Sequence, residues 1–353
     1  MKSSLLDSFA PRPKRARIGA VVAAIAVVGL GLAGCTGGGT PSPTETNADG
    51  GGASNGVKVV VMGGAPDDPF WSTVKRGAEA AAAAVEFGGG TVEFVSMPNY
   101  DNFDADAAKL VATMKSMEPS AVVIPNWSPD AQNENIKAIS DAGIPVIIYN
   151  SGQGTIDDVG AGIYIGSDDS VAGVAGGEAF AEDGAKNVLC VNTLPGKVNS
   201  EARCAGVIEG ATAKGAAASA LNLPDSQFGD PSAVTQAIKG ALLSDPTIDA
   251  VITIGTTDAD SAALAIEQAG ATETVLLGTF DVSEASLDRI AEGTQAFAID
   301  QQPYAQGYYA TSAAFQQAAY GIYLPVSPLL TGPALITQDN IDVVLKGVEL
   351  GVR

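Results

Sequence analysis

The stretch VKVVVMGGAPDDPFWSTVKRGAEAAAAAVEF, residues 57–87, holds the pattern that decides the fold. It begins with a short β-branched run, passes through Gly, Pro and Asp, and ends in an Ala-rich amphipathic segment. A continuous apolar run such as Val59-Val60-Val61 is typical of a strand buried on both faces, as in parallel sheets covered by helices. The stretch therefore predicts a strand over 57–62 followed by a helix over 71–87.

The same alternation continues along the rest of the chain. Short β-branched runs bounded by Gly, Pro, Asn or Asp predict strands over 57–62, 92–96, 121–125, 146–150, 163–166, 188–192, 250–255, 275–280 and 296–299. Ala-rich stretches predict helices over 71–87, 104–117, 132–142, 171–181, 201–214, 231–243, 260–269, 283–291, 305–320 and 340–350. This alternation predicts an α/β fold with parallel sheets covered by helices on both faces. A chain of 353 residues has room for two such sheets of about five strands each.

The first 35 residues have the pattern of an export signal. A basic leader precedes the apolar run 18–34, which is the order of a secretory signal. The run ends in Leu32-Ala33-Gly34-Cys35, which resembles the lipobox of bacterial lipoproteins. This resemblance implies a lipid on Cys35, so we expect the protein outside the cytoplasm and anchored to the cell membrane; an uncleaved signal anchor is the alternative. Residues 36–56 are almost all small or polar and predict a flexible linker.

Composition excludes several classes of function. Forty acidic against nineteen basic side chains give a net charge of -21, which disfavours contact with a nucleic-acid backbone. The chain has no histidine, so Ser-His-Asp catalysis and His-ligated zinc are excluded. No pair of carboxylates is marked out for glycoside hydrolysis. We therefore expect a protein that is not an enzyme and that needs no cofactor or metal.

Polar and aromatic residues gather at the ends of the predicted strands. In doubly wound sheets, ligands bind at the carboxyl ends of the strands. The candidate binding residues at these ends are Asp68, Phe70, Trp71, Asn126, Asn150, Thr256, Asp258, Phe280, Asp281 and Gln301. Aromatic rings beside carboxylates and amides suit a neutral sugar, because a ring stacks on its C–H face and planar polar groups take its hydroxyls. The alternative is that the aromatic residues belong to the core and the polar ones are helix N-caps.

Five short segments resemble the type I periplasmic substrate-binding proteins of sugar ABC transporters, most closely their ribose-binding branch. The segments are Asp68-Pro69-Phe70-Trp71, Ile165-Gly166-Ser167-Asp168, Ser200-Glu201-Ala202-Arg203, Gly278-Thr279-Phe280-Asp281 and Gln301-Gln302-Pro303. The resemblance implies two Rossmann-like lobes, joined by a hinge of three crossovers, that close on the ligand. The lobes would be residues 57–166 plus 303–330 and residues 167–302 plus 331–353. It also implies that Arg203 clamps the sugar and that Asp281 accepts two of its hydroxyls.

The function that this resemblance implies is capture of a sugar or sugar-like polyol for an ABC importer. The partners would be the ligand, the permease subunits and, through the lipid, the membrane; a monomer is expected. A sensor whose closed form is read by a membrane receptor or kinase is the alternative. Ribose binders carry Asp-Arg where this chain has Asn150-Ser151, so inositol, a hexose, a pentitol or a nucleoside stay open as ligands.

Two cysteines remain besides Cys35. Cys190 lies in the predicted strand 188–192, and Cys204 lies near the start of the next predicted helix, 201–214. Outside the cytoplasm such a pair can oxidise, and a disulfide would fix the segment that presents Arg203. Two buried free thiols are the alternative. Without histidine or a Cys-x-x-Cys motif, neither cysteine is expected to bind metal.

Overall fold

The structure, a computed structural model, describes residues 56–353. The predicted export signal, the lipidation site Cys35 and the predicted linker up to residue 55 lie outside the described residues. Within residues 56–353, no helix is both long and apolar enough to cross a membrane.

Six strands form the first sheet, which we name sheet A. They are β1 (Lys58–Gly63), β2 (Thr91–Ser96), β3 (Ala121–Ile124), β4 (Val146–Tyr149), β5 (Ile163–Ser167) and β11 (Leu329–Gly332). Their spatial order is β2-β1-β3-β4-β5-β11, and every neighbouring pair is parallel. The apolar runs of β1, β3 and β4 are almost fully buried, as expected for strands covered on both faces.

The second sheet, sheet B, repeats this winding. It consists of β6 (Asn187–Asn192), β7 (Ala217–Asn222), β8 (Ala250–Thr253), β9 (Leu276–Phe280), β10 (Phe297–Asp300) and β12 (Ala334–Ile336). The order is β7-β6-β8-β9-β10-β12, with β12 antiparallel to β10 and the other pairs parallel. In both sheets the second strand, β2 or β7, forms the edge beside the first strand, β1 or β6, and the following strands are added on the other side of the first strand. The point where the strand order reverses therefore lies beside the first strand of each sheet.

The chain passes between the two sheets three times. It leaves sheet A after β5, returns after β10 to form α10 and β11, and leaves again after β11 to form β12. The predicted α/β fold with three crossovers is therefore confirmed. Each sheet has six strands where about five were expected, because β7, β11 and β12 were not predicted from the sequence. The strand β7 has the sequence AASALN, which lacks the β-branched residues that mark a strand, and β11 and β12 are only three or four residues long.

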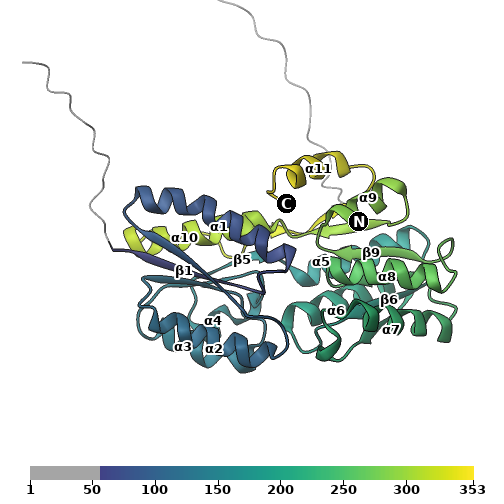
Figure 1. The fold of residues 1–353 in the computed structure, drawn as a ribbon, viewed down its shortest axis with the longest axis horizontal. Helices are drawn as coiled ribbons and strands as arrows, with labels where there is room; N and C mark the ends of the chain where they lie inside the picture. The colour runs from purple at the N-terminus through teal and green to yellow at the C-terminus, as the bar shows by residue number, and fades with distance from the viewer. Residues whose placement is uncertain (1–55) are drawn as a thin grey trace, which may run out of the picture. The chain divides into compact units, whose positions relative to one another are not determined.

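Helices cover both faces of each sheet (Figure 1). Their bounds are α1 (Pro69–Phe87), α2 (Phe103–Ser116), α3 (Pro129–Ser140), α4 (Ile156–Val159), α5 (Asp169–Glu182), α6 (Val198–Ala213), α7 (Pro231–Ser244), α8 (Thr256–Gln268), α9 (Glu284–Glu292), α10 (Pro303–Tyr320) and α11 (Ile341–Glu349). Helices α1 and α10 lie on one face of sheet A, and α2 and α3 lie on the other. In sheet B, alternate residues of β6 decide the faces: Cys190 packs in the core under α5 and α6, and Val191 packs in the core under α7 and α8.

A disulfide joins β6 to α6. The structure bonds Cys190 to Cys204 with a Cα–Cα distance of 5.5 Å, which is common for disulfides. Both residues are buried. The bond therefore fixes the first half of α6 against the sheet, directly beside Arg203.

Glycines allow two pairs of helices to approach closely. A Cβ atom on Gly77 of α1 would lie 2.0 Å from the carbonyl oxygen of Tyr304, and one on Gly307 of α10 would lie 2.0 Å from the carbonyl oxygen of Val74. Helices α5 and α6 meet in the same way through Gly173 and Gly206. The neighbouring atoms are backbone, so they cannot move aside as a side chain could.

We predict that Gly307→Ala lowers the free energy of unfolding by about 1 to 3 kcal/mol, because the added methyl group forces α1 and α10 apart. Gly240→Ala is the matched control, because Gly240 lies in helix α7 with nothing within 4 Å of its Cβ position. The control should stabilise the protein by about 0.5 to 1 kcal/mol through its helix propensity. Urea unfolding of both variants measures the difference, and equal effects would show that the two helices do not need this close approach.

Candidate functional site

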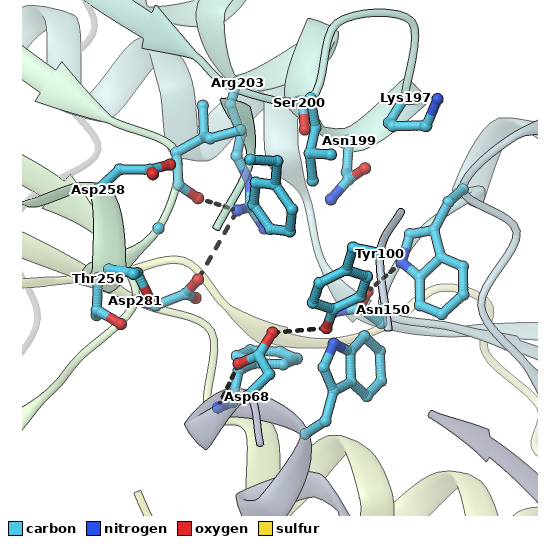
Figure 2. Close-up of a pocket in the computed structure, with 18 of the residues that line it drawn as sticks. Asp68, Tyr100, Asn150, Lys197, Asn199, Ser200, Arg203, Thr256, Asp258 and Asp281 are labelled. Atoms are coloured by element: carbon cyan, nitrogen blue, oxygen red, sulfur yellow. Dashed lines mark hydrogen bonds and ion pairs between the residues drawn. The ribbon is translucent and has the colours of Figure 1, made fainter. Parts of the chain in front are cut away.

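A cavity lies between the carboxyl ends of the two sheets (Figure 2). Its walls come from the segments after β1, β2, β3 and β4 on one side, and from the segments after β6, β8, β9 and β10 on the other. The space between its atoms is about 750 Å³, including open solvent at the mouth.

One guanidinium group organises the sheet B wall. The Nε of Arg203 donates to Asp169 Oδ1 at 2.8 Å, and its Nη1 donates to the carbonyl oxygen of Ile254 at 2.7 Å. The Nη1 atom also lies 3.9 Å from Asp281 Oδ2, and the guanidinium carbon lies 4.8 Å from the ring centroid of Phe280. Asp169, the carbonyl group of Ile254 and the ring of Phe280 therefore hold the guanidinium group in place. The ion pair of Arg203 and Asp281 lines the cavity.

Asp281 is held at the carboxyl end of β9 in an unusual backbone conformation. Its φ is +66°, and its Oδ1 accepts a hydrogen bond from Gln301 Nε2. Asn150, at the end of β4, has a φ of +62°. Non-glycine residues rarely adopt this left-handed region, and such strain concentrates at binding sites. Both side chains line the cavity.

The sheet A wall is aromatic. Five aromatic residues line the cavity there: Phe70, Trp71, Tyr100, Phe103 and Trp127. Neighbouring rings pack in a row, with centroid distances of 5.1 Å from Phe70 to Trp71, 5.3 Å from Trp71 to Trp127, 5.3 Å from Trp127 to Phe103 and 5.7 Å from Phe103 to Tyr100. Phe228 joins the row from the sheet B side, 5.0 Å from Tyr100. The Tyr100 hydroxyl donates to Asp68 Oδ2 at 2.7 Å, which fixes a carboxylate at the edge of the rings. Asp68 also caps α1 by accepting from the amide of Phe70.

Side chains and backbone groups of the two walls also contact each other directly. Lys197 Nζ, on the sheet B side, lies 2.9 Å from Asp104 Oδ1 at the start of α2. The amide of Val198 donates to the carbonyl oxygen of Trp127 at 3.0 Å. Together with the ring contact of Tyr100 and Phe228, these contacts connect the sheets in addition to the three crossovers.

Nine of the eleven residues predicted from the strand ends and the resemblance line the cavity: Asp68, Phe70, Trp71, Asn150, Arg203, Thr256, Asp258, Asp281 and Gln301. Two do not. The Asn126 side chain is fully buried, where its Nδ2 donates to Asn133 and Thr155, and its neighbour Trp127 faces the cavity instead. Phe280 is buried beneath Arg203 and supports the guanidinium without reaching the cavity.

Eleven further residues line the cavity and were not predicted: Tyr100, Phe103, Trp127, Leu194, Lys197, Asn199, Ser200, Phe228, Ile254, Gly255 and Thr257. Trp127 and Thr257 directly follow predicted residues, so the strand-end rule could have found them. Tyr100 follows β2 by four residues and could also have been found. Phe228 lies in the loop before α7, and no local pattern in the sequence marks it.

The polar groups in the cavity are mainly acceptors. Among the described residues, Asn199 Oδ1, Gln301 Oε1 and Ser200 Oγ are buried and make no hydrogen bond. The carboxylates of Asp68, Asp258 and Asp281 add further acceptor oxygens. A molecule with several hydroxyl groups beside an apolar face matches this arrangement. No cluster of three or more acidic or cysteine side chains within residues 56–353 is placed to hold a metal ion.

Burial changes the titration of two cavity carboxyls. Asp258 is 4% exposed, and this burial raises its pKa from 3.8 to about 6, although the Thr193 hydroxyl donates to it at 2.6 Å. Burial also raises the pKa of Asp281 to about 6, against the opposing effects of Arg203 and Gln301. Each carboxylate is less favourable in the folded protein than in the unfolded chain at neutral pH.

We predict that the ligand-free protein gains stability as the pH falls from 7 to 4. A raised folded-state pKa means that the contribution of Asp258 is fully present below pH 3.8 and is lost as the pH rises through about 6. Asp258→Asn should remove this pH-dependent contribution to the free energy of unfolding, which is roughly 3 kcal/mol at most. The variant should therefore be more stable than the wild type at pH 7. Melting temperatures between pH 4 and 7 measure the effect. Asp260→Asn, an exposed neighbour paired with Arg289, is the control and should keep the wild-type slope; a variant of Asp258 with that same slope would refute the assignment.

Comparison with known proteins identifies the family. Residues 59–321 match the periplasmic binding protein domain. A carbohydrate transporter from Acidothermus cellulolyticus, solved with myo-inositol, is 31% identical with a TM-score of 0.76, over 84% of this chain and all of that one. The glucose-galactose binding protein GanP from Geobacillus stearothermophilus is 20% identical with a TM-score of 0.71, over 80% of this chain and 98% of that one. The xylose/arabinose-binding protein of Sulfolobus acidocaldarius is 24% identical over 80% of this chain and 72% of that protein.

The resemblance seen in the sequence is thereby confirmed, and the two wound sheets, the three crossovers and the cavity between the carboxyl ends agree with the matched family. The chain belongs to the periplasmic binding protein family and has the type I fold of its sugar-binding members.

Proposed function

We propose that this protein captures a sugar or sugar-like polyol outside the cytoplasm and delivers it to an ABC importer. The observation that carries the proposal is the pairing of two unlike walls around one cavity. The Arg203, Asp281 and Gln301 cluster faces the aromatic rings of the opposite wall. Such a site binds a ring with one apolar face and many hydroxyls. No bond is made or broken in this function, so the protein acts as a binder and not as an enzyme.

Within this class, we favour a cyclic polyol such as myo-inositol. The structural neighbour with 31% identity was solved with myo-inositol, and the match covers 84% of this chain and all of that one. The cavity supplies acceptor oxygens from Asp68, Asp258 and Asp281, which suit a ligand that carries a hydroxyl on every ring carbon. Asn150 stands where ribose binders have Asp. Its Oδ1 already accepts from Trp127 Nε1 and its Nδ2 donates to Gln306 Oε1, so one N–H and one lone pair of the amide remain for the ligand.

The protein would open and close on its ligand as two lobes. The proposed lobes are residues 57–166 plus 303–330 and residues 167–302 plus 331–353. Sheet A with α1 and α10 supports the first assignment, and sheet B with α5 and α6 supports the second. The bridging pairs Lys197 with Asp104 and Val198 with Trp127 would then exist only in the closed form. We further propose a monomer whose Cys35 carries the lipid anchor and whose lobes are recognised by the permease subunits.

Ligand binding by the purified protein tests this function. The protein is unfolded and refolded to remove carried-over ligand, and its melting temperature is measured with myo-inositol, xylose, arabinose, glucose, galactose, allose, ribose and nucleosides. A ligand at 100 times its dissociation constant stabilises the fold by about 2.7 kcal/mol, so myo-inositol should raise the melting temperature by several degrees. A larger shift with an aldose would replace the inositol assignment, and no shift with any of them would contradict the proposed function.

We predict that Asp281→Asn weakens binding of the identified ligand by about 10- to 100-fold, because it removes a charged acceptor that faces the cavity. Asparagine is chosen because it tolerates the left-handed backbone conformation that Asp281 adopts. Titration calorimetry measures the affinity. Asp260→Asn serves as the control carboxylate outside the cavity and should bind like the wild type. Unchanged affinity in the Asp281 variant would remove this carboxylate from the binding site.

A further inference from the structure

An exposed apolar surface lies on the sheet A side, far from the cavity. It consists of Phe87 at the end of α1 and of residues at and after the end of α10, and we name these side chains the apolar tip: Phe87, Tyr320, Ile322, Tyr323, Leu324 and Val326. Phe87 is 79% exposed and Tyr323 is 67% exposed. Contiguous exposed apolar groups of this kind mark interaction surfaces, whereas scattered ones do not.

The end of α1 lies beside the end of α10, where the other members of the apolar tip begin. A Cβ atom on Gly88, next to Phe87, would lie 2.9 Å from the Tyr320 hydroxyl oxygen. The loop after α10 then runs along the start of β5, where the amide of Tyr164 donates to Ser327 Oγ at 3.2 Å. This edge holds the amino ends of the sheet A strands, and the cavity lies at their carboxyl ends. A surface bound to the tip would therefore leave the cavity uncovered.

The segment that carries all members of the tip except Phe87 contains no charged residue. No residue from Gln301 to Gln338 is Asp, Glu, Lys or Arg, although the chain has 40 acidic and 19 basic residues. A solvent-facing segment of an acidic protein normally carries charges for solubility. Tyr320 and Tyr323 have an apolar ring with a polar end, which is the residue type enriched where proteins meet the boundary between lipid and water.

The start of the described chain lies at this same edge. The carbonyl oxygen of Val57 accepts from the amide of Thr91 at 2.8 Å, and Gly90, next to it, packs beside Phe315 of α10. In Figure 1 the coloured ribbon begins beside the end of α10. Cys35 precedes Val57 by the 21 residues 36–56. The sequence predicts a flexible linker over these residues, and a flexible chain of 21 residues spans about 25 Å on average. We therefore expect a lipid on Cys35 to keep the bilayer close to the tip.

We propose that, while the anchored protein collects ligand, the apolar tip rests on the lipid bilayer and the cavity is directed away from the membrane surface. Delivery to the permease requires the tip to leave the bilayer. This inference rests on the lipid anchor at Cys35 that the proposed function includes. The contact is apolar and interfacial, because the protein is acidic overall and the segment from Gln301 to Gln338 offers no positive charge to anionic lipid. A second copy of the chain is the competing occupant.

The test uses the full lipidated protein reconstituted in phosphatidylcholine vesicles that contain spin-labelled lipid. Val326→Cys places a fluorophore at the tip, and Val343→Cys, on α11, is the matched control at a valine of similar exposure. The native Cys190 and Cys204 are joined in the disulfide, so the new thiol is the one that reacts. We expect at least twofold stronger quenching by the spin-labelled lipid at position 326 than at position 343, and no loss of it in 0.5 M NaCl.

Equal quenching at the two positions in protein that floats with the vesicles would overturn the tip contact and leave the anchor standing. Protein that does not float would overturn both the anchor and the contact. If the fluorescence of the label at position 326 changed with protein concentration in the absence of vesicles, and the protein were a dimer in solution, the tip would be assigned to contact with a second copy of the chain instead. The melting shift with the sugar panel on the same samples reports the cavity separately. Tyr323→Ser combined with Leu324→Ser should reduce quenching at position 326 by at least half without changing that melting shift.

Discussion

The ion pair between Arg203 and Asp169 is the interaction on which the binding wall depends. A buried guanidinium must be paired, because the cost of removing its charge from water is otherwise too high. Here the partner carboxylate is 10% exposed and lies at the first residue of α5, directly after the first crossover. The same guanidinium reaches the end of β8 through Ile254 and the end of β9 through Asp281. One side chain therefore sets the positions of a helix start and two strand ends around the cavity.

Other features keep Arg203 in that position. The disulfide of Cys190 and Cys204 holds the first half of α6 against β6. The close contact of α5 and α6 through Gly173 and Gly206 fixes the distance between the helix that carries Arg203 and the helix that carries Asp169. The ring of Phe280 closes the space behind the guanidinium. A preorganised wall loses less conformational entropy when the ligand binds, which favours affinity.

The aromatic wall is fixed by contacts of a different kind. Trp71 packs in the core of sheet A and also lines the cavity, so the core position expected as the alternative does not keep it away from the candidate site. Asp68 likewise caps α1 and presents a carboxylate to the cavity. Lys197 and Phe228 reach the aromatic wall from the sheet B side. The residues that connect the two sides of the cavity thus contact rings that also pack in the core of sheet A.

The sequence by itself determined the alternation of strands and helices, the parallel character of the sheets and the general position of the site. The β-branched runs and the Ala-rich stretches decide which segments are strands and helices, and in a parallel sheet the carboxyl ends of the strands meet at one edge. This is why Asp68, Asn150, Asp258 and Asp281 could be named in advance.

The tertiary structure decided what local pattern does not encode. It decided that Trp127 and not Asn126 faces the cavity, that Phe280 supports Arg203 from behind, and that Tyr100 and Phe228 meet across the site. Side-chain direction at a strand end depends on where the strand stops and on which helix packs there. Contacts between residues more than a hundred positions apart depend on how the two sheets meet, so these features appear only when the whole chain is folded.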